Sequence, residues 1–348
     1  MNTLQFEAAI SAVANINAGI NTGNSLEAHG HYTGDDISGF ETQWGEPPLT
    51  TELFEAMAAE GFNAVRIPVT WKHHFDEQGI IDPKWLAHVE WAVSEVLSLG
   101  LYCIINIHHD GGEGSWIISS TEGFRQKGWL FRKLWEQIAE HFKDYGEKLL
   151  FEAVNEPINV ERVWTANDPD SIEGTLLFNQ CFVDVVRASG GNNAQRNLIV
   201  MPYAGAWSAG RLESFIMPKD PAQGHMIFEI HSYDPEGFCW YKAPWTTVRD
   251  GWGTADDYAQ LNYLTLQLSG FMHKWNVPAI VGEFGSQDKQ NEPARAMQAG
   301  AFVSAMREIG VKCFWWECGA FCVFNRRECT VKFPEIVKAL VGEVNSEQ

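Results

Sequence analysis

Short apolar runs alternate with longer amphipathic stretches along almost the whole chain, and this alternation constrains the fold more than any other feature. Several runs are apolar at consecutive positions, which is expected of parallel strands covered on both faces. The eight runs are 17–23, 62–69, 102–108, 149–155, 197–203, 226–233, 278–284 and 311–317. The helix-like stretches are 50–60, 85–99, 129–144, 172–188, 257–275, 293–309 and 333–343, and the interval 204–225 has room for a short helix only.

Eight strand-like runs with helical spacers favour a (β/α)8 TIM barrel, an α/β fold, over a doubly wound sheet. The length of 348 residues fits one large domain or two small ones, and the sequence contains no low-complexity linker. We therefore expect residues 1–348 to form a single barrel domain, with the length beyond ~250 residues in loops.

The composition restricts the class of ligand. The formal net charge of −20 repels polyphosphates and anionic membrane surfaces, so the charge argues against nucleic-acid binding. A neutral polymer is not repelled. The 15 Trp residues indicate either an aromatic core or a sugar-binding groove, because flat indole faces stack on pyranose rings. We expect about half of them in the core.

The cysteines and the N-terminus restrict the setting of the protein. Seven Cys without a CxxC pair argue against a complete disulfide framework or a zinc knuckle, and we expect reduced thiols. Cys318, Cys322 and Cys329 are close enough in sequence for one local disulfide. No run approaches the ~20 apolar residues of a membrane span. The first 21 residues lack the basic and apolar regions of a signal peptide.

Polar residues end six of the eight runs. In a (β/α)8 barrel the catalytic groups come from the C-terminal ends of strands. Any one of these residues alone reads equally well as a hydrogen-bonded polar group at a strand end, but six at the same end favour a site. They are Arg66, His108-His109-Asp110, Asn155-Glu156-Pro157, His231-Ser232-Tyr233, Glu283 and Trp315-Trp316-Glu317.

Two of these residues, Glu156 and Glu283, are carboxylates on runs four and seven, which lie across the predicted barrel mouth from one another. Glycoside hydrolysis uses two carboxyl groups that flank the scissile bond, one protonated and one ionised. Opposite strands can hold such groups about 5–5.5 Å apart, which is the separation in retaining enzymes. Arg66 is suited to keep one carboxylate ionised. A salt-bridged strand-end acid remains the alternative for either glutamate.

The run His108-His109-Asp110 raises the alternative of a metal-dependent hydrolase. Adjacent strand residues point to opposite faces, so the two histidines are not expected to chelate one ion. The sequence contains neither His-x-His nor His-Glu-x-x-His. We therefore expect no metal and no cofactor.

An ordered set of motifs resembles glycoside hydrolase family 5, the large cellulase family, over nearly the whole chain. Single motifs such as GEFG are weak, but the ordered set is highly specific. The matching segments are GINTGNSLEAHG, GFNAVRIPVTW, YCIINIHHD, LLFEAVNEP, IHSY, VGEFG and FWWECG.

The resemblance implies catalytic roles for five residues. Glu156, in NEP, is implied to be the general acid/base, and Glu283, in GEFG, the nucleophile. Tyr233 and Arg66 are implied to hold the nucleophile, and His231 to neighbour the acid/base.

The resemblance also implies substrate contacts. Asn155 is expected to hydrogen-bond the sugar 2-hydroxyl, and His108 and Trp316 to line the −1 subsite, with Trp316 as the platform. Less direct matches suggest four further contacts, namely His109, Asn24, Glu27 and Trp207, the last of which is equally well read as a packing residue.

These matches imply an endo-β-1,4-glucanase, a cellulase that cleaves internal bonds of β-glucans by a retaining double displacement. FVDVVRASGGNN and WGEPPLT look most like the endoglucanase, lichenase and xyloglucanase branches, and less like the mannanases. Another β-1,4-glycanase, such as a licheninase, xyloglucanase or mannanase, remains the alternative. The loop CGAFCVFNRREC departs from the family pattern and leaves fine specificity open.

The implied setting follows from the substrate. We expect a secreted monomer whose signal peptide has been removed, with a β-glucan polysaccharide as its partner and with neither nucleic acid nor membrane bound. A catalytically inactive carbohydrate-binding barrel would lack one of the two glutamates, and both are present.

Overall fold

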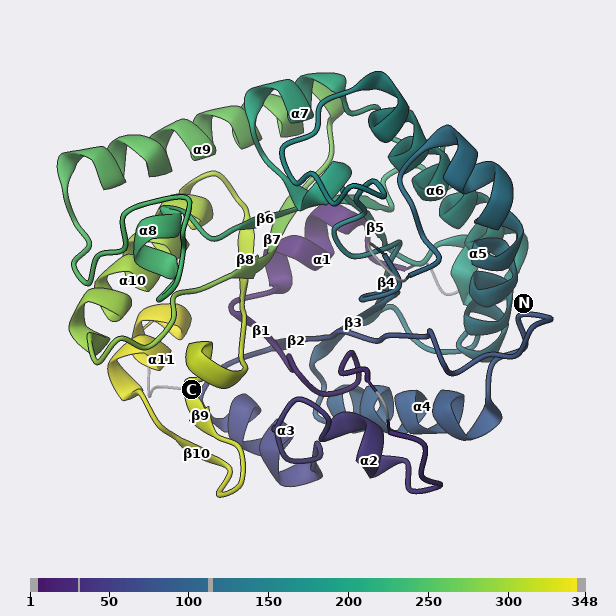
Figure 1. The fold of residues 1–348 in the computed structure, drawn as a ribbon, viewed down its shortest axis with the longest axis horizontal. Helices are drawn as coiled ribbons and strands as arrows, with labels where there is room; N and C mark the ends of the chain where they lie inside the picture. The colour runs from purple at the N-terminus through teal and green to yellow at the C-terminus, as the bar shows by residue number, and fades with distance from the viewer. Residues whose placement is uncertain (1–5, 31, 112–114, 343–348) are drawn as a thin grey trace.

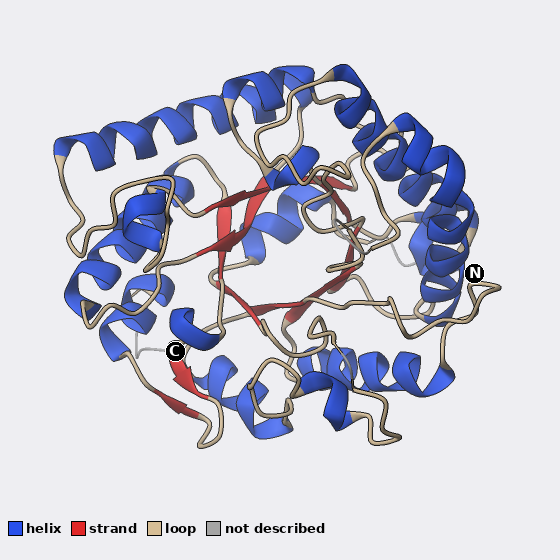
Figure 2. Cartoon of the chain, in the orientation of Figure 1, coloured by secondary structure: helices blue, strands red, loops and turns tan. Residues whose placement is uncertain are grey.

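A closed ring of eight parallel strands with helices around it forms the centre of the molecule (Figure 2). This computed structural model describes residues 6–30, 32–111 and 115–342. The fold is a (β/α)8 TIM barrel, as the alternation of apolar runs predicted. Among the described helices, none is long and apolar enough to span a membrane.

Each predicted run contains one barrel strand, and each strand is shorter than its run, because residues at one or both ends of the run belong to the loops. The strands are β1 (Gly19–Asn21), β2 (Ala64–Ile67), β3 (Tyr102–Asn106), β4 (Leu149–Glu152), β5 (Leu198–Val200), β6 (Met226–Ser232), β7 (Ala279–Phe284) and β8 (Lys312–Trp315). The barrel closes where β1 pairs with β8, Gly19 lying opposite Phe314. The pairing of β6 with β7 shifts register after Ile230.

The helices that follow the strands form the outer ring (Figure 1). Side-chain caps fix the starts of several of them, because Ser, Thr and Asp accept hydrogen bonds from the first free backbone N–H groups, as Ser120 does from Gly123 at α5. They are α3 (Thr51–Ala59), α4 (Pro83–Ser98), α5 (Thr121–His141), α6 (Pro169–Ala188), α7 (Ala209–Ser214), α9 (Ala255–Trp275), α10 (Glu292–Glu308) and α11 (Pro334–Val341). The prediction of a short helix in 204–225 is confirmed by α7.

The sequence analysis missed the shorter elements. They are the helices α1 (Ala9–Asn15), α2 (Ser38–Glu41) and α8 (Glu236–Cys239), the single 3-10 turns at Gly191–Ala194, Tyr203–Gly205 and Gly319–Phe321, and the hairpin of β9 (Phe324–Asn325) and β10 (Thr330–Val331). Helix α1 projects onto the middle of the strand ring in Figure 1, because it packs against the inner side chains at the N-terminal ends of the strands. It therefore closes the base of the barrel.

The hairpin after β8 carries the loop that departs from the family pattern. Arg326 at its turn donates to the Ser25 hydroxyl at 3.0 Å and to the carbonyl of Glu317. The loop after β8 is thereby tied to the loop after β1. All seven cysteines are unpaired, including Cys318, Cys322 and Cys329 of this segment.

Candidate active site

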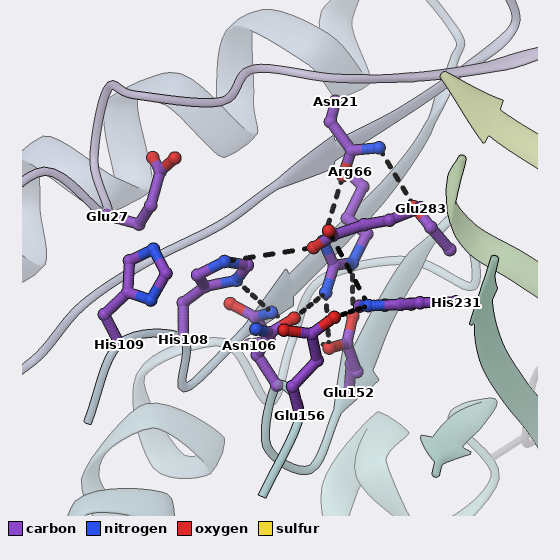
Figure 3. Close-up of polar contacts among 12 residues, drawn as sticks. Asn21, Glu27, Arg66, Asn106, His108, His109, Glu152, Glu156, His231 and Glu283 are labelled. Atoms are coloured by element: carbon purple, nitrogen blue, oxygen red, sulfur yellow. Dashed lines mark hydrogen bonds and ion pairs between the residues drawn. The ribbon is translucent and has the colours of Figure 1, made fainter. Parts of the chain in front are cut away.

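The C-terminal ends of the strands bring the predicted polar residues together at the barrel mouth (Figure 3). Strand β2 supplies Arg66, β6 supplies His231 and β7 supplies Glu283. The residues directly after β3, β4 and β8 supply the remainder, which includes His108, His109, Asn155, Glu156 and Trp316.

Arg66 is the centre of this cluster. Its guanidinium is fully buried and has five N–H groups, each of which has an acceptor. The Nε and Nη2 groups form a two-pronged pair with Glu152 at 2.6 and 2.7 Å, and Nη2 also donates to Asn155 Oδ1 at 2.8 Å. Nη1 donates to Asn21 Oδ1 at 3.0 Å and to Glu283 Oε1 at 2.8 Å. The arginine is therefore fixed in position, and it fixes Glu283 in turn.

The carboxylate of Glu283 is held by donors on both oxygens. Arg66 donates to Oε1, and the Tyr233 hydroxyl donates to Oε2 at 2.9 Å. Burial raises the pKa of Glu283, while the cations of His231 and Arg66 and the Tyr233 hydroxyl oppose this rise. The predicted contacts of Arg66 and Tyr233 with Glu283 are present in the structure.

Glu156 lies in the loop that follows β4 and has a left-handed backbone conformation, with φ at 39°. Such a conformation is unfavourable for a non-glycine residue and is found most often at functional sites. His231 Nδ1 lies 2.7 Å from Glu156 Oε1 and 3.6 Å from Glu283 Oε2. Burial alone would lower the pKa of His231, but the charge of Glu283 and the bonds to Glu156 and Glu229 raise it to about 10. The protonated form of His231 is therefore favoured, with Glu156 and Glu283 both within reach of Nδ1.

His108 and Trp316 form a parallel aromatic pair on one side of the carboxylates, with ring centroids 5.8 Å apart and an interplanar angle of 7°. Asn106 Nδ2 donates to His108 Nδ1 at 3.1 Å, so the proton of a neutral His108 is on Nε2, which lies 3.9 Å from Glu283. Burial and the neighbouring cations lower the pKa of His108 well below its usual value. His108 thus presents a neutral N–H group to the site.

His109 does not follow the geometry assumed in the sequence analysis. Strand β3 ends at Asn106, so residues 108 and 109 lie beyond the pleat, and the strict alternation of faces does not apply to them. The rings of His108 and His109 meet edge to face with centroids 4.4 Å apart, and His109 also contacts Trp44. Asp110 accepts from the backbone of Trp71 instead. The premise that both histidines lie in a strand was therefore wrong, whereas the prediction that they do not chelate one ion stays a prediction.

Among the described residues, the group whose possible metal-ligand atoms lie within 4.8 Å of one another is Glu156, His231 and Glu283. It does not include the run His108-His109-Asp110. One oxygen of Glu156 and one of Glu283 are therefore no more than 4.8 Å apart. Such a closest approach of two oxygens is compatible with the ~5–5.5 Å between the carboxyl groups of retaining enzymes.

Three further predicted residues lie around this centre. Asn24 adopts a left-handed conformation, with φ at 57°, in the turn after β1. The carboxylate of Glu27 is fully buried and accepts from the backbone N–H groups of Asn24 and Ser25. The indole of Trp207 donates to Asp234 Oδ2 at 2.6 Å and packs against the ring of Tyr263.

The sequence analysis missed a polar layer directly beneath these residues. Its members are buried polar side chains of the strands themselves, namely Glu229 within β6 and the last residues of β1, β3 and β4, which are Asn21, Asn106 and Glu152. The signal was present in the sequence, since a glutamate in the middle of LLFEAV or of MIFEIH is unusual for a buried strand. The sequence analysis considered the ends of the apolar runs, which extend beyond these residues, and so passed over them.

The arrangement can carry out chemistry that needs two carboxyl groups in unlike surroundings. Glu283 has an arginine and a tyrosine hydroxyl on its oxygens, whereas Glu156 is half-buried beside an imidazolium. The parallel rings of His108 and Trp316 lie on the side of Glu283. One carboxyl group is thus held as an acceptor, and the other is free to exchange a proton with a ligand.

Comparison with known proteins is consistent with this geometry. Residues 26–321 match the family model described as cellulase (glycosyl hydrolase family 5). Among characterised relatives, the cellulase/esterase CelE of Acetivibrio thermocellus is 34% identical over 348 residues. The alignment covers 96% of this chain and 40% of CelE, so the chain spans less than half of that protein.

Solved structures match over nearly the full chain. A broad-specificity endoglucanase from Ruminococcus champanellensis, with bound cellotriose, superposes with a TM-score of 0.91 at 29% identity, covering 97% of this chain and 100% of that one. PbGH5A from Prevotella bryantii B14, a glycoside hydrolase family 5 enzyme in complex with a xyloglucan tetradecasaccharide, superposes with a TM-score of 0.89 at 34% identity, covering 97% and 98%.

Proposed function

The chain belongs to glycosyl hydrolase family 5, and from this premise we propose that it is an endo-β-1,4-glucanase that cleaves internal bonds of β-glucans with retention at the anomeric carbon. The observation that carries the proposal is the pair Glu156 and Glu283, with carboxylate oxygens within 4.8 Å of one another at the barrel mouth. This spacing favours two displacements through a covalent intermediate over direct attack by water.

Glu283 is the nucleophile in this proposal. Arg66 and Tyr233 aim its two oxygens, and their N–H and O–H groups favour the ionised form of the carboxylate. Its attack on the anomeric carbon forms a glycosyl ester and breaks the bond to the leaving oxygen. The charge on Glu283 disappears in that step.

Glu156 is the general acid and then the general base. It gives a proton to the leaving oxygen while the ester forms, and later takes one from the attacking water. His231 holds Glu156 Oε1 from the inner side, which leaves Oε2 for this exchange. Glu156 has given up its proton by the end of the first step, so its carboxylate is available as the base in the second.

The surrounding residues bind the sugar. We assign Trp316 as the platform of the −1 subsite and the Nε2–H group of His108 as a hydrogen-bond donor there. The two rings are parallel neighbours, so both can line the same subsite. The oxygen of the Asn155 amide accepts from Arg66, so its N–H2 end serves the sugar 2-hydroxyl. The outer contacts are assigned to His109, Asn24, Glu27 and Trp207, with buried Glu27 acting through the Asn24 turn that it braces.

A second candidate activity is cleavage of side-chain-decorated glucan. PbGH5A, 34% identical to this chain over almost its whole length, was crystallised with a xyloglucan oligosaccharide. Licheninase and mannanase activities would use the same two glutamates.

We further propose that residues 1–348 act as one monomeric catalytic domain outside the cell, because β-glucan polymers are extracellular substrates.

Hydrolysis of a substrate panel tests the proposal. The panel contains carboxymethylcellulose, barley β-glucan, xyloglucan, mannan and xylan, with product sizes recorded and Glu283→Ala as the control for background activity. We expect oligosaccharides from the first two substrates and a β-anomer as the first-formed product. An initial α-anomer, or strong mannan cleavage without glucan cleavage, would overturn the proposal.

A further inference from the structure

Glu229, in the middle of β6, is a buried acid to which the proposed reaction gives no role. Its side chain is fully inaccessible to solvent. Oε1 lies 3.5 Å from Arg66 Nε, but all five N–H groups of Arg66 are directed to other acceptors, and Oε2 has no partner. A buried acid with one oxygen unpaired is costly, so its retention calls for a reason.

The neighbouring strand is shaped around this carboxyl group. Gly282 lies in β7 immediately before Glu283, and a Cβ atom there would lie 1.5 Å from Glu229 Oε1. The register between β6 and β7 shifts at the same place, where Ile230 pairs with Val281 but His231 pairs with Glu283. The glycine thus makes room for Glu229 directly beneath the proposed nucleophile.

His231 connects Glu229 to the proposed acid/base. Its Nε2 lies 3.4 Å from Glu229 Oε1, and its Nδ1 lies 2.7 Å from Glu156 Oε1. An imidazolium donates from both nitrogens, so it can hold the two acids at once. Loss of the Nε2–H contact would leave the ring free to tilt and would remove the constraint on Glu156.

We propose that Glu229 is a positioning residue for the reaction, and that it accepts a hydrogen bond from His231 Nε2–H and thereby keeps His231 protonated and aimed at Glu156. This inference rests on the proposed function, because it gives a task to Glu229 only if Glu156 is the acid/base. It assigns Gly282 a role as well, as the residue that leaves space for the Glu229 carboxyl group.

The charges around Glu229 come from two other strands and from its own. Arg66 on β2 and His231 on β6 favour the ionised form, whereas Glu152 on β4 repels it. Burial, followed by the charge of Glu152, raises the pKa of Glu229 to about 7. At higher pH Glu229 is ionised, and its charge favours the protonated form of His231. Removal of that charge is therefore expected to move the basic limb of activity to lower pH.

The test is Glu229→Gln, which keeps the shape and an acceptor oxygen but cannot ionise. Cello-oligosaccharides need a proton on the leaving oxygen, whereas 2,4-dinitrophenyl β-cellobioside does not. The measured quantity is kcat/KM, which reports the glycosylation step. For cello-oligosaccharides we expect it to fall about tenfold, which is less than the ~100-fold loss of rate that misplacement of a catalytic group can cause. For the aryl substrate we expect less than about a threefold loss, and the basic limb moves down by about one pH unit.

Glu41→Gln is the matched control. Glu41 is a second buried glutamate paired with a histidine, His88, and it lies on α2 outside the strand ring. We expect this variant to melt at a lower temperature without any change in leaving-group dependence or in the basic limb. If Glu229→Gln instead lowered both substrates equally with no movement of the limb, or had no effect, the inference would be overturned.

A measurement on the unmodified protein covers the case in which Glu229→Gln does not fold. The ¹⁵N signals of His231, assigned with His231→Asn, are expected to show both ring nitrogens protonated at pH 8. A neutral imidazole at pH 8 would overturn the inference. Failure of the proposed function looks different, because Glu156→Ala would then leave glucan cleavage intact.

Discussion

The two ends of the barrel differ although the same strands build both. At the base, the inward-facing residues are apolar, among them Ala64, Leu150 and Ile227, and α1 packs against this layer. Two residues further along the same strands lie the charged groups Arg66, Glu152 and Glu229, and alternation in a strand keeps both sets on the inner face. Along each of these strands, a distance of two residues thus separates the apolar base layer, whose burial stabilises the fold, from the charged layer, whose burial is costly.

This difference teaches that stability and chemistry are assigned to different layers. Burial of apolar side chains favours folding by about 25 cal/mol per Å². Buried charges require partners of opposite charge, and at the mouth these partners are Arg66 and His231. Burial also makes the acids beside them harder to ionise. Substitutions at the mouth are therefore expected to change activity, and substitutions at the base to change the free energy of unfolding.

The largest effect is expected for the proposed nucleophile. We expect Glu283→Ala to lower glucan hydrolysis by about 10⁴-fold or more, as removal of a nucleophile commonly does. The melting temperature is expected to stay close to that of the parent, because Arg66 keeps its two bonds to Glu152. Thermal unfolding followed by circular dichroism checks this, and a large drop would contradict the separation of layers.

The second prediction concerns Glu156→Ala. We expect at least a 100-fold loss on natural glucans, which is the low end for a positioned acid. Aryl glycosides with good leaving groups are still expected to glycosylate the enzyme, and added azide to release a β-glycosyl azide. An α-glycosyl azide with this variant, and the β product with Glu283→Ala, would reverse the two roles.

The third prediction tests the base. Phe314 is fully buried in the base layer, with its ring against Gly19. We expect Phe314→Ala to lower the free energy of unfolding by about 3–5 kcal/mol, through lost burial and the cavity left behind. Turnover per folded molecule is expected to stay within about twofold, since no charged residue of the mouth is altered. Denaturant titration and kcat at low temperature separate the two quantities.

The fourth prediction concerns pH. Burial raises the pKa of Glu27 to about 7, above its unfolded value, so the stability that its protonated form contributes is complete below about 4.5 and is lost as the pH rises through 7. At the outer ring, bonds from Arg249 and the backbone outweigh burial and lower the pKa of Asp257 to about 2, so its contribution is lost only when the pH falls.

We therefore expect the melting temperature to fall between pH 5 and pH 8. The contribution of Glu27 to this fall is on the order of 2 kcal/mol. Glu27→Gln is expected to flatten the curve over this range, and Asp257→Asn to leave its slope there unchanged. If the plot of melting temperature against pH stayed as steep in Glu27→Gln, burial of the Glu27 carboxyl group would not be the cause of the loss of stability.

The smallest effect is expected from chelation. The carboxylates of the mouth are already matched by the guanidinium of Arg66 and the imidazolium of His231, and a double displacement needs no Lewis acid. We expect exhaustive treatment with a chelator to leave activity unchanged. Loss of turnover that zinc restored would assign the cluster of Glu156, His231 and Glu283 to a metal instead.

The parts of the site that follow from strand ends were predictable from sequence. Glu156 and Glu283 each stand at the end of a long apolar run, Arg66 is the one charged residue inside its run, and the geometry of a barrel brings the three together at the mouth. Glu152 and Glu229 were missed because each stands inside its apolar run. From the sequence alone, a single charged residue there looks like an exception to the apolar pattern, and only the structure shows that its side chain points into the barrel. Their partners come from other strands, which a linear pattern cannot identify.

The short helices and turns were also not predicted from the sequence. Helix α1 has seven residues, too few for a helical period to stand out, and it is stabilised by contact with the base layer rather than by its own sequence. The relation of His108 to His109 depended on where β3 ends, and strand boundaries are the least certain result of pattern analysis.

The pairing of β1 with β8 sets the order in which the site is assembled during synthesis. Asn21 donates to the carbonyl of Trp315, 294 residues later in the chain. At roughly 5–20 residues per second, a ribosome leaves the first strand without its second neighbour for about 15–60 s. Throughout that interval the nascent chain carries an open strand edge and a half-built ring of acids. The joining of the seam ends the period of greatest exposure to aggregation and proteolysis and completes the site at the same moment.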